Sequence, residues 1–224
     1  MFYRAGEKIR YCAVGTRVVF LDLERNRYFG LPAPSEPLFL KWLTADGQLD
    51  EAGVASLSLL TEPGYLVPTS EPVKPFRQAE IEPPTSDLWT ASAQSTTARY
   101  ILLAFWWQIT AALRLRLLPF RTTLAALEAR TRRKRREAVE PDGEARSIAA
   151  AFDRLGYLIG RTDQCLVRSV AQFHMSWARG VPVRLVIGVR CDPFAAHCWV
   201  QREGSILNDS AENVRNFTPL LVVG

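Results

Sequence analysis

Three consecutive segments between Asp163 and Asp209 constrain the fold more than any other part of the sequence. The first, DQCLVRSVAQFHMSWARG, has apolar residues at the spacing of one buried helix face, and Gly180 and Pro182 predict its end. Those apolar residues are Leu166, Val170, Phe173 and Trp177. Residues 183–190 then alternate in hydrophobicity as a strand does, and AAHCWVQ and SILND predict two further strands joined by REG. A helix followed by an antiparallel hairpin indicates an α+β fold.

Cys165 lies at the start of the predicted helix. Asp163 is a reasonable N-cap, which would place Cys165 in the first turn. Unpaired backbone N–H groups and the positive end of the helix dipole favour a thiolate over a thiol there. Cys165 is therefore a candidate nucleophile.

The predicted hairpin brings His197 and Asp209 together. If residues 202–204 form a three-residue loop, Gly204 takes the left-handed position and Gln201 faces Ser205. Counting back along both strands, His197 then faces Asp209 on the same side of the sheet. A two-residue loop would instead put Asp209 opposite the neighbouring cysteine, Cys198.

A thiol at a helix N-terminus with an imidazole oriented by a carboxylate is the arrangement of cysteine peptidases and transglutaminases. His197 would accept the proton of Cys165 and later protonate the leaving amine, and Asp209 would hold the ring tautomer. The backbone N–H of Cys165 and the side chain of Gln164 are candidate oxyanion donors. Spacing alone also fits an ordinary buried cysteine and a histidine packed in the core.

Other residues that carry similar chemistry fit less well. Cys198 points to the opposite face of the strand from its neighbour, and His174 lies more than two helical turns beyond the candidate nucleophile. Asp192 precedes a proline in a predicted turn, and Arg168 either braces the site or is a solvated helix residue. Cys191 and Cys198 are seven residues apart across that turn, but without further Cys or His nearby no metal site is expected.

The segments CLVRS, AHCWV and ND, at this spacing, resemble the leader peptidase of lasso peptide biosynthesis, which has a transglutaminase-like fold. The resemblance covers residues 97–224 and carries a Cys–His–Asp triad onto Cys165, His197 and Asp209. It implies cleavage of a leader from a ribosomally made precursor peptide, followed by ring closure by a separate ATP-dependent cyclase. It implies no cofactor. A transglutaminase-like acyltransferase and a non-catalytic, peptide-presenting adaptor remain the alternatives.

Length and composition limit the number of domains and the cellular compartment. A chain of 224 residues can form one large domain or two small ones. Four cysteines without short paired spacing favour a reducing compartment, and the start MFYRAGEKIRYC has no apolar signal core. A bacterial cytoplasmic location is expected.

Residues 1–70 are expected to form a winged-helix-like module. IRYCAV, RVVFLDL and RYFGL predict a three-stranded antiparallel sheet, followed by helices beginning near Ser35 and Asp50. The second helix carries acids and no base, so nucleic-acid binding is not expected. VVFLDLERNRYFGL resembles the precursor-recognition element of peptide-modifying systems, where the leader adds as a strand beside the third strand. The residues that the resemblance implies for leader binding are Arg27, Tyr28, Phe29 and Leu31.

Residues 71–96 are rich in proline and predict a linker before the peptidase domain at 97–224. The apolar run 100–113 is shorter than the roughly 20 residues of a membrane span, so a buried helix is expected. Membrane association is not expected, although Trp106 and Trp107 leave open an interfacial or partner-facing surface. The basic run 130–136 fits a solvated helix end or a site for an acidic partner such as the cyclase.

Overall fold

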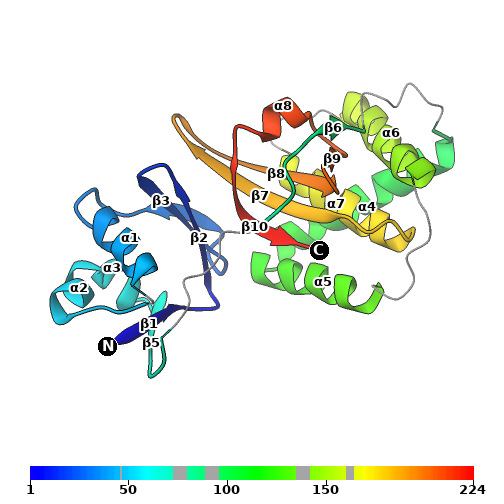
Figure 1. The fold of residues 1–224 in the computed structure, drawn as a ribbon. Coiled ribbons are helices and arrows are strands. Elements are labelled where there is room, and N and C mark those ends of the chain that lie inside the picture. The colour runs from blue at the N-terminus through cyan, green and yellow to red at the C-terminus, as the bar shows by residue number, and fades with distance from the viewer. Residues whose placement is uncertain (46, 73–79, 89–95, 135–141, 160–163) are drawn as a thin grey trace. The chain divides into compact units, whose positions relative to one another are not determined.

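The computed structural model describes residues 1–45, 47–72, 80–88, 96–134, 142–159 and 164–224 (Figure 1). The chain forms two compact units, Met1–Glu80 and Ile81–Gly224. Each unit has its own sheet and its own buried core.

The first unit is built on a three-stranded antiparallel sheet in the order β2-β3-β4, as the sequence predicts. Its strands are β1 (Phe2–Ala5), β2 (Ile9–Val14), β3 (Arg17–Asp22), β4 (Arg27–Gly30) and β5 (Leu66–Thr69). Gly15, with φ +60°, supplies the left-handed residue of the tight turn that pairs Val14 with Arg17. The pair formed by β1 and β5 joins the two ends of this unit and was not foreseen from the sequence.

Three short helices cover the sheet: α1 (Glu36–Thr44), α2 (Glu51–Ser56) and α3 (Ser58–Thr61). Asp50 caps α2 by accepting a hydrogen bond from Gly53 N at 2.7 Å. Ser35 stands at the N-cap of α1, but its hydroxyl donates to Ser56 O instead and links the two helices. Both helices begin where their cap residues predict.

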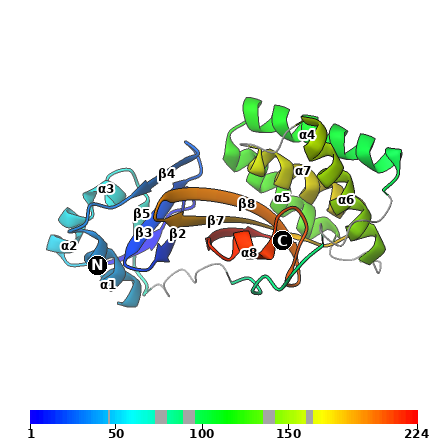
Figure 2. The ribbon, with the colours of Figure 1, turned by 90° about the horizontal axis from the view of Figure 1, so that it is seen from above.

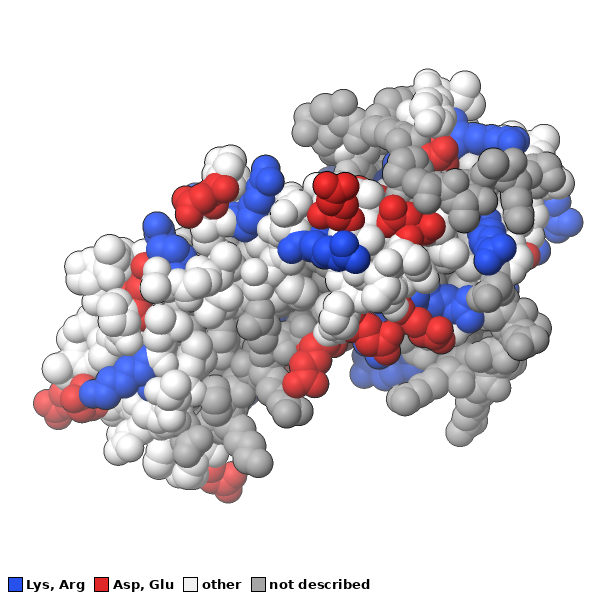
Figure 3. Space-filling view, turned by 45° about the horizontal axis from the view of Figure 1, so that its top comes forward, with Lys and Arg blue, Asp and Glu red and all other residues white. Residues whose placement is uncertain are grey.

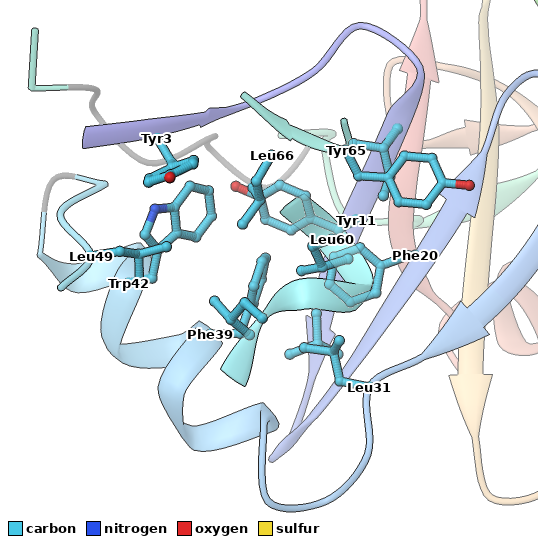
Figure 4. Close-up of a cluster of buried hydrophobic side chains, with 13 residues drawn as sticks. Tyr3, Tyr11, Phe20, Leu31, Phe39, Trp42, Leu49, Leu60, Tyr65 and Leu66 are labelled. Atoms are coloured by element: carbon cyan, nitrogen blue, oxygen red, sulfur yellow. The ribbon is translucent and has the colours of Figure 1, made fainter. Parts of the chain in front are cut away.

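Aromatic rings fill the core of the first unit (Figure 4). Phe20 of β3 and Phe39 of α1 are almost completely buried, and their ring centroids lie 5.0 Å apart in an edge-to-face arrangement. Trp42, one turn after Phe39, stacks beside it at 5.0 Å. The i, i+3 spacing of Phe39 and Trp42 therefore directs one face of α1 onto the sheet.

The second unit contains a five-stranded sheet in the order β10-β7-β8-β9-β6, with helices on both faces. Its strands are β6 (Ser86–Asp87), β7 (Arg184–Cys191), β8 (Phe194–Arg202), β9 (Ser205–Ile206) and β10 (Thr218–Val223). Its helices are α4 (Ala98–Leu117), α5 (Phe120–Lys134), α6 (Asp142–Ile159), α7 (Cys165–Ala178) and α8 (Ala211–Val214). Helices α4 to α7 gather on one face of the sheet and α8 lies on the other (Figure 2).

Part of the segment expected to be a linker belongs to this sheet. Ser86–Asp87 pairs in parallel with Ser205–Ile206, and Thr85 N donates to Gly204 O at 2.7 Å. A Cβ on Gly204 would lie 2.5 Å from Thr85 Oγ1, so the close approach of this segment requires glycine. Proline-rich composition did not reveal a strand of two residues.

Helix α7 is the central helix of the second unit. It packs against α4, α5, α6 and the strands β7 and β8, and its residues from Ser169 to Trp177 are all buried. The apolar face predicted from the sequence is therefore only part of the buried surface. Among the described residues, no helix is long and apolar enough to cross a membrane.

Candidate active site

Cys165 is the first residue of α7, and Gln164 takes the N-cap position; the expected cap, Asp163, lies outside the described residues. Burial alone would raise the pKa of the Cys165 thiol. Hydrogen bonding and charge from His197, with the backbone N–H groups of Cys198 and Leu166, outweigh burial and lower this pKa below its ordinary value. The thiol is thus poised to ionise.

His197, on β8, is hydrogen-bonded to Asp209 through its Nε2 atom, 2.5 Å from the Asp209 Oδ2. Burial alone would lower the pKa of the imidazole, but the hydrogen bonds and charges of Asp209 and Cys165 raise it to about 9. Burial likewise would raise the pKa of Asp209, yet its hydrogen bonds hold that pKa below the ordinary value. The three residues therefore favour a thiolate, an imidazolium and a carboxylate.

The route by which His197 reaches Asp209 differs from the predicted one. Arg202 pairs directly with Ser205, so the hairpin loop has two residues, and Glu203 rather than Gly204 has a positive φ, +47°. That register would place Asp209 opposite Cys198 if the strand continued. The strand ends at Ile206. Leu207 N still donates to Val200 O at 2.9 Å, and the chain leaves the ladder after Leu207.

Asn208 explains this departure from the ladder. Its side-chain oxygen accepts from Val200 N at 2.9 Å, where a continuing strand would offer a backbone carbonyl. Its Nδ2 donates to Ser169 Oγ at 2.8 Å, and Ser169 Oγ donates to Cys198 O. This chain of hydrogen bonds ties the loop that carries Asp209 to both α7 and β8.

Asp209 is held by two residues that the sequence interpretation missed. Asn213 Nδ2 donates to Asp209 Oδ2 at 2.9 Å, and Ser210 N donates to Asp209 Oδ1 at 2.7 Å. Ser210 also caps α8 by accepting from Asn213 N. The local sequence DSAEN, a cap residue followed by a short helix, is the signal that would have located this support.

Gly188 makes room for the rings around His197. It pairs with His197 across β7 and β8, and a Cβ at this position would lie 2.8 Å from the Trp199 ring. Trp199 and Phe217 flank the imidazole with ring centroids 6.2 and 5.2 Å from it. These contacts fix the plane of the imidazole that faces the thiol.

A cavity of about 220 Å³ opens at these side chains. Its lining residues are Asp153, Cys165, Arg168, His197, Cys198, Asn208 and Asp209. Asp153, on α6, had not been singled out from the sequence, and Arg168 lines the cavity one helical turn after the cysteine. The cavity therefore carries charge of both signs beside the thiol.

Gln164 is oriented by a buried residue of α4. Gln108 is 6% exposed on an otherwise apolar helix face, and its Nε2 donates to Gln164 Oε1 at 2.8 Å. This hydrogen bond occupies the amide oxygen of Gln164 and leaves its N–H₂ group able to donate. Gln164 is not among the residues that line the cavity, so its role as an oxyanion donor stays a prediction.

Comparison with known proteins identifies the family of the second unit. Residues 105–222, just over half of the chain, match the family model described as "Transglutaminase-like superfamily". The chain belongs to the transglutaminase-like superfamily. Its match to the microcin J25-processing protein McjB of Escherichia coli is 42% identical over 52 residues, 23% of this chain and 24% of McjB. The match thus spans about a quarter of the length of this relative.

No solved structure matches the chain. The superfamily match and the match to McjB confirm the resemblance noted in the sequence motifs. They also agree with the mixed α+β architecture of the second unit.

The competing residues of this transglutaminase-like unit lie away from the thiol or face elsewhere. His174 is buried and stacks on Trp107 with ring centroids 5.7 Å apart, and neither ring nitrogen has a hydrogen-bond partner among the described residues. Cys198 is buried, which raises its thiol pKa far above the ordinary value. Cys191 pairs with Phe194 in the register of β7 and β8, and neither Cys191 nor Cys198 forms a disulfide bond. Asp192 lies in the turn between β7 and β8.

Within the described residues, no group of three or more Cys, His, Asp or Glu could hold a metal ion.

The residues implied in leader binding lie on and after β4 of the first unit, an edge strand of its sheet. Phe29 stacks on Phe20 at 5.1 Å and Leu31 is 5% exposed, so both contribute to the core. Tyr28 points to the opposite face of the strand from Phe29, and Arg27 is exposed. Of the four, Arg27 has an exposed side chain, and Tyr28 and Phe29 are both half-buried.

Proposed function

We propose that this protein is a cysteine peptidase that cleaves the leader from a ribosomally made lasso precursor peptide. The observation that carries the proposal is the hydrogen-bonded His197 and Asp209 beside a thiol, Cys165, whose pKa is lowered. The match to a microcin J25-processing protein supports a peptide as the substrate.

In the proposed reaction the Cys165 thiolate attacks the carbonyl carbon of the scissile peptide bond. The Cys165 N–H and the Gln164 amide stabilise the oxyanion that forms. Imidazolium His197 then gives its proton to the leaving amine, which departs as the new N-terminus of the core peptide. The leader remains attached to Cys165 as a thioester.

A water molecule completes the cycle. Neutral His197 removes a proton from the water, which attacks the thioester and releases the leader with a free carboxylate. Asp209 stabilises the imidazolium at each stage and keeps Nδ1 directed at the thiol, because its own hydrogen bond occupies Nε2. The free core amine is then the group that a separate ATP-dependent cyclase would acylate.

The first unit is proposed to hold the leader. The outer edge of β4 presents backbone N–H and C=O groups to which an extended peptide can add as a further strand. Arg27 and Tyr28 are the side chains available to read that peptide, and Phe29 and Leu31 keep the strand in place. Because both units belong to one chain, a bound leader raises the effective concentration of its scissile bond at Cys165.

The test compares Cys165→Ala with Cys191→Ala, a matched loss of a partly exposed thiol on the same unit. With a precursor peptide followed by mass spectrometry, Cys165→Ala should lose at least about a thousandfold in cleavage rate. Cys191→Ala should cleave normally, and fluorescence anisotropy should find peptide binding retained in both. Cleavage by Cys165→Ala at the wild-type rate would disprove the mechanism.

The same experiment separates hydrolysis from acyl transfer. A leader product with a free carboxylate indicates that water resolved the thioester. A leader joined to an added amine indicates the acyltransferase alternative, which uses the same thiolate and imidazole.

A further inference from the structure

Helix α4 presents an apolar stripe to solvent. Its members share one face of the helix and have exposed fractions between 39% and 72%. They are Leu102, Phe105, Trp106, Ile109, Leu113 and Leu117. The opposite face, with Ala104, Gln108 and Ala111, is buried against the unit. The helix is thus anchored on one side, and its other, mostly apolar side is exposed in the part of the chain that the structure describes.

The charges on α4 are of one sign. Arg99 precedes Leu102 by three residues and Arg116 follows Leu113 by three, so an arginine flanks each end of the stripe on the same face. From residue 98 to residue 127 the sequence contains four arginines and no Asp or Glu. On the face drawn in Figure 3, by contrast, acidic and basic side chains are interspersed.

A second copy of the chain is a poor partner for this stripe. Two-fold pairing of α4 with itself would bring Arg99 against Arg116 in the antiparallel case. In the parallel case each arginine would meet its own copy. Neither arrangement offers a carboxylate from α4 to neutralise these charges, so the electrostatic term opposes self-association.

We propose that α4 docks this protein onto the surface of an anionic lipid bilayer. Exposed leucine and tryptophan side chains enter the boundary between headgroups and acyl chains, and Arg99 and Arg116 contact lipid phosphates. Trp106, 62% exposed, is the residue type enriched at that boundary. The helix lies in the interface plane and does not span the bilayer.

The structure thereby shows which of the two tryptophans, Trp106 or Trp107, lies on the exposed face of α4. Trp106 faces solvent, while Trp107 packs inward on His174 with Arg130 5.4 Å above its ring. The stripe from Arg99 to Arg116 is roughly 25 Å long at helical rise, enough for a sustained contact with a flat surface. Helix α8, which follows Asp209, lies on the other face of the sheet from α4 (Figure 2).

The experiment measures co-sedimentation of the full chain with vesicles. Vesicles of phosphatidylcholine and phosphatidylglycerol in equal amounts should bind the chain, and vesicles of phosphatidylcholine alone should bind it much less. Arg99→Gln/Arg116→Gln should weaken binding roughly thirtyfold, from two lost contacts with an anionic surface. Leu102→Gln/Leu113→Gln should weaken it by about tenfold or more through lost apolar burial.

Leu59→Gln is the matched control, since Leu59 is an exposed leucine of α3 in the first unit. It should bind vesicles as the wild type does, and circular dichroism should find all variants folded. Absence of binding to phosphatidylglycerol vesicles overturns the proposal. So does binding that both double variants retain, or a dimer in light scattering that Leu102→Gln/Leu113→Gln dissociates without any vesicle binding.

Discussion

The second unit contains two histidines, the buried His174 and the half-buried His197, whose rings have different surroundings. His197 has a carboxylate at 2.5 Å and a thiol beside it, and its pKa rises to about 9. Burial, together with the charges of Arg130 and Arg114, lowers the pKa of His174 to about 4. Burial acts in the same direction on both rings. The partners, and not the depth, decide which ring carries a proton at neutral pH.

The contrast also separates a reactive site from a packing site. His197 lines a cavity that reaches the thiol, so its proton can be transferred. His174 stacks between helices on Trp107 and has no acidic partner in the described structure. We therefore interpret His174 as a packed aromatic ring that is kept neutral.

The largest expected effect comes from removing each of the two imidazole rings in turn. His197→Ala should lower precursor cleavage by about a thousandfold or more, because the thiolate loses its counter-ion and the leaving amine its proton donor. His174→Leu should stay within a few fold of the wild type. Cleavage rates followed by mass spectrometry measure both. Equal losses in the two variants would show that the comparison is wrong.

A smaller effect is expected from removing the charge that raises the His197 pKa. Asp209→Asn should lower cleavage by about a hundredfold and move the alkaline limb of the pH–rate profile from near pH 9 toward pH 6.5. The pKa of His197 should fall in this variant, because a neutral partner stabilises the imidazolium less than a carboxylate does. The pH profile of kcat/KM tests this. An unmoved alkaline limb would assign that limb to another group.

The smallest effect concerns stability. Between pH 6.5 and about 4 the folded state binds fewer protons at His174 than the unfolded state does. This contribution to the free energy of unfolding is complete above about pH 6.5 and is lost as the pH falls toward 4, by on the order of 3 kcal/mol. His197 has the opposite sign, since its contribution is present below about pH 6.5 and is lost as the pH rises through 9.

Urea unfolding at several pH values checks this difference. His174→Leu should flatten the acid slope relative to the wild type while leaving the alkaline slope unchanged. An identical acid slope in both proteins would assign the acid sensitivity to the carboxylates instead.

Some of the fold follows from local sequence. The α7 helix, the strands β7 and β8 and the three-stranded sheet of the first unit were predicted, because apolar periodicity and turn residues report local structure directly. Pairing of β6 with β9 was not foreseen. It joins segments 119 residues apart through two residues each, so neither carries a periodic signal.

In the candidate site, too, some features were predictable from local sequence and others were not. Cys165 at the start of a helix could be predicted, since the helix pattern begins there. The meeting of His197 and Asp209 was predicted for a wrong reason, because the hairpin loop has two residues and not three. The carboxylate reaches the ring because Asn208 takes the chain out of the ladder and α8 holds Asp209 in place.

By itself, then, the sequence determined which residues are candidates for the chemistry and which elements hold most of them, since these depend on residue type and on spacing within one element. Only the tertiary structure decided the orientation of Gln164 by Gln108, the support of Asp209 by Asn213 and the exposure of the α4 stripe. Each of these depends on contacts between elements, or on the lack of them. Such contacts are set by the packing of whole units, which no local pattern records.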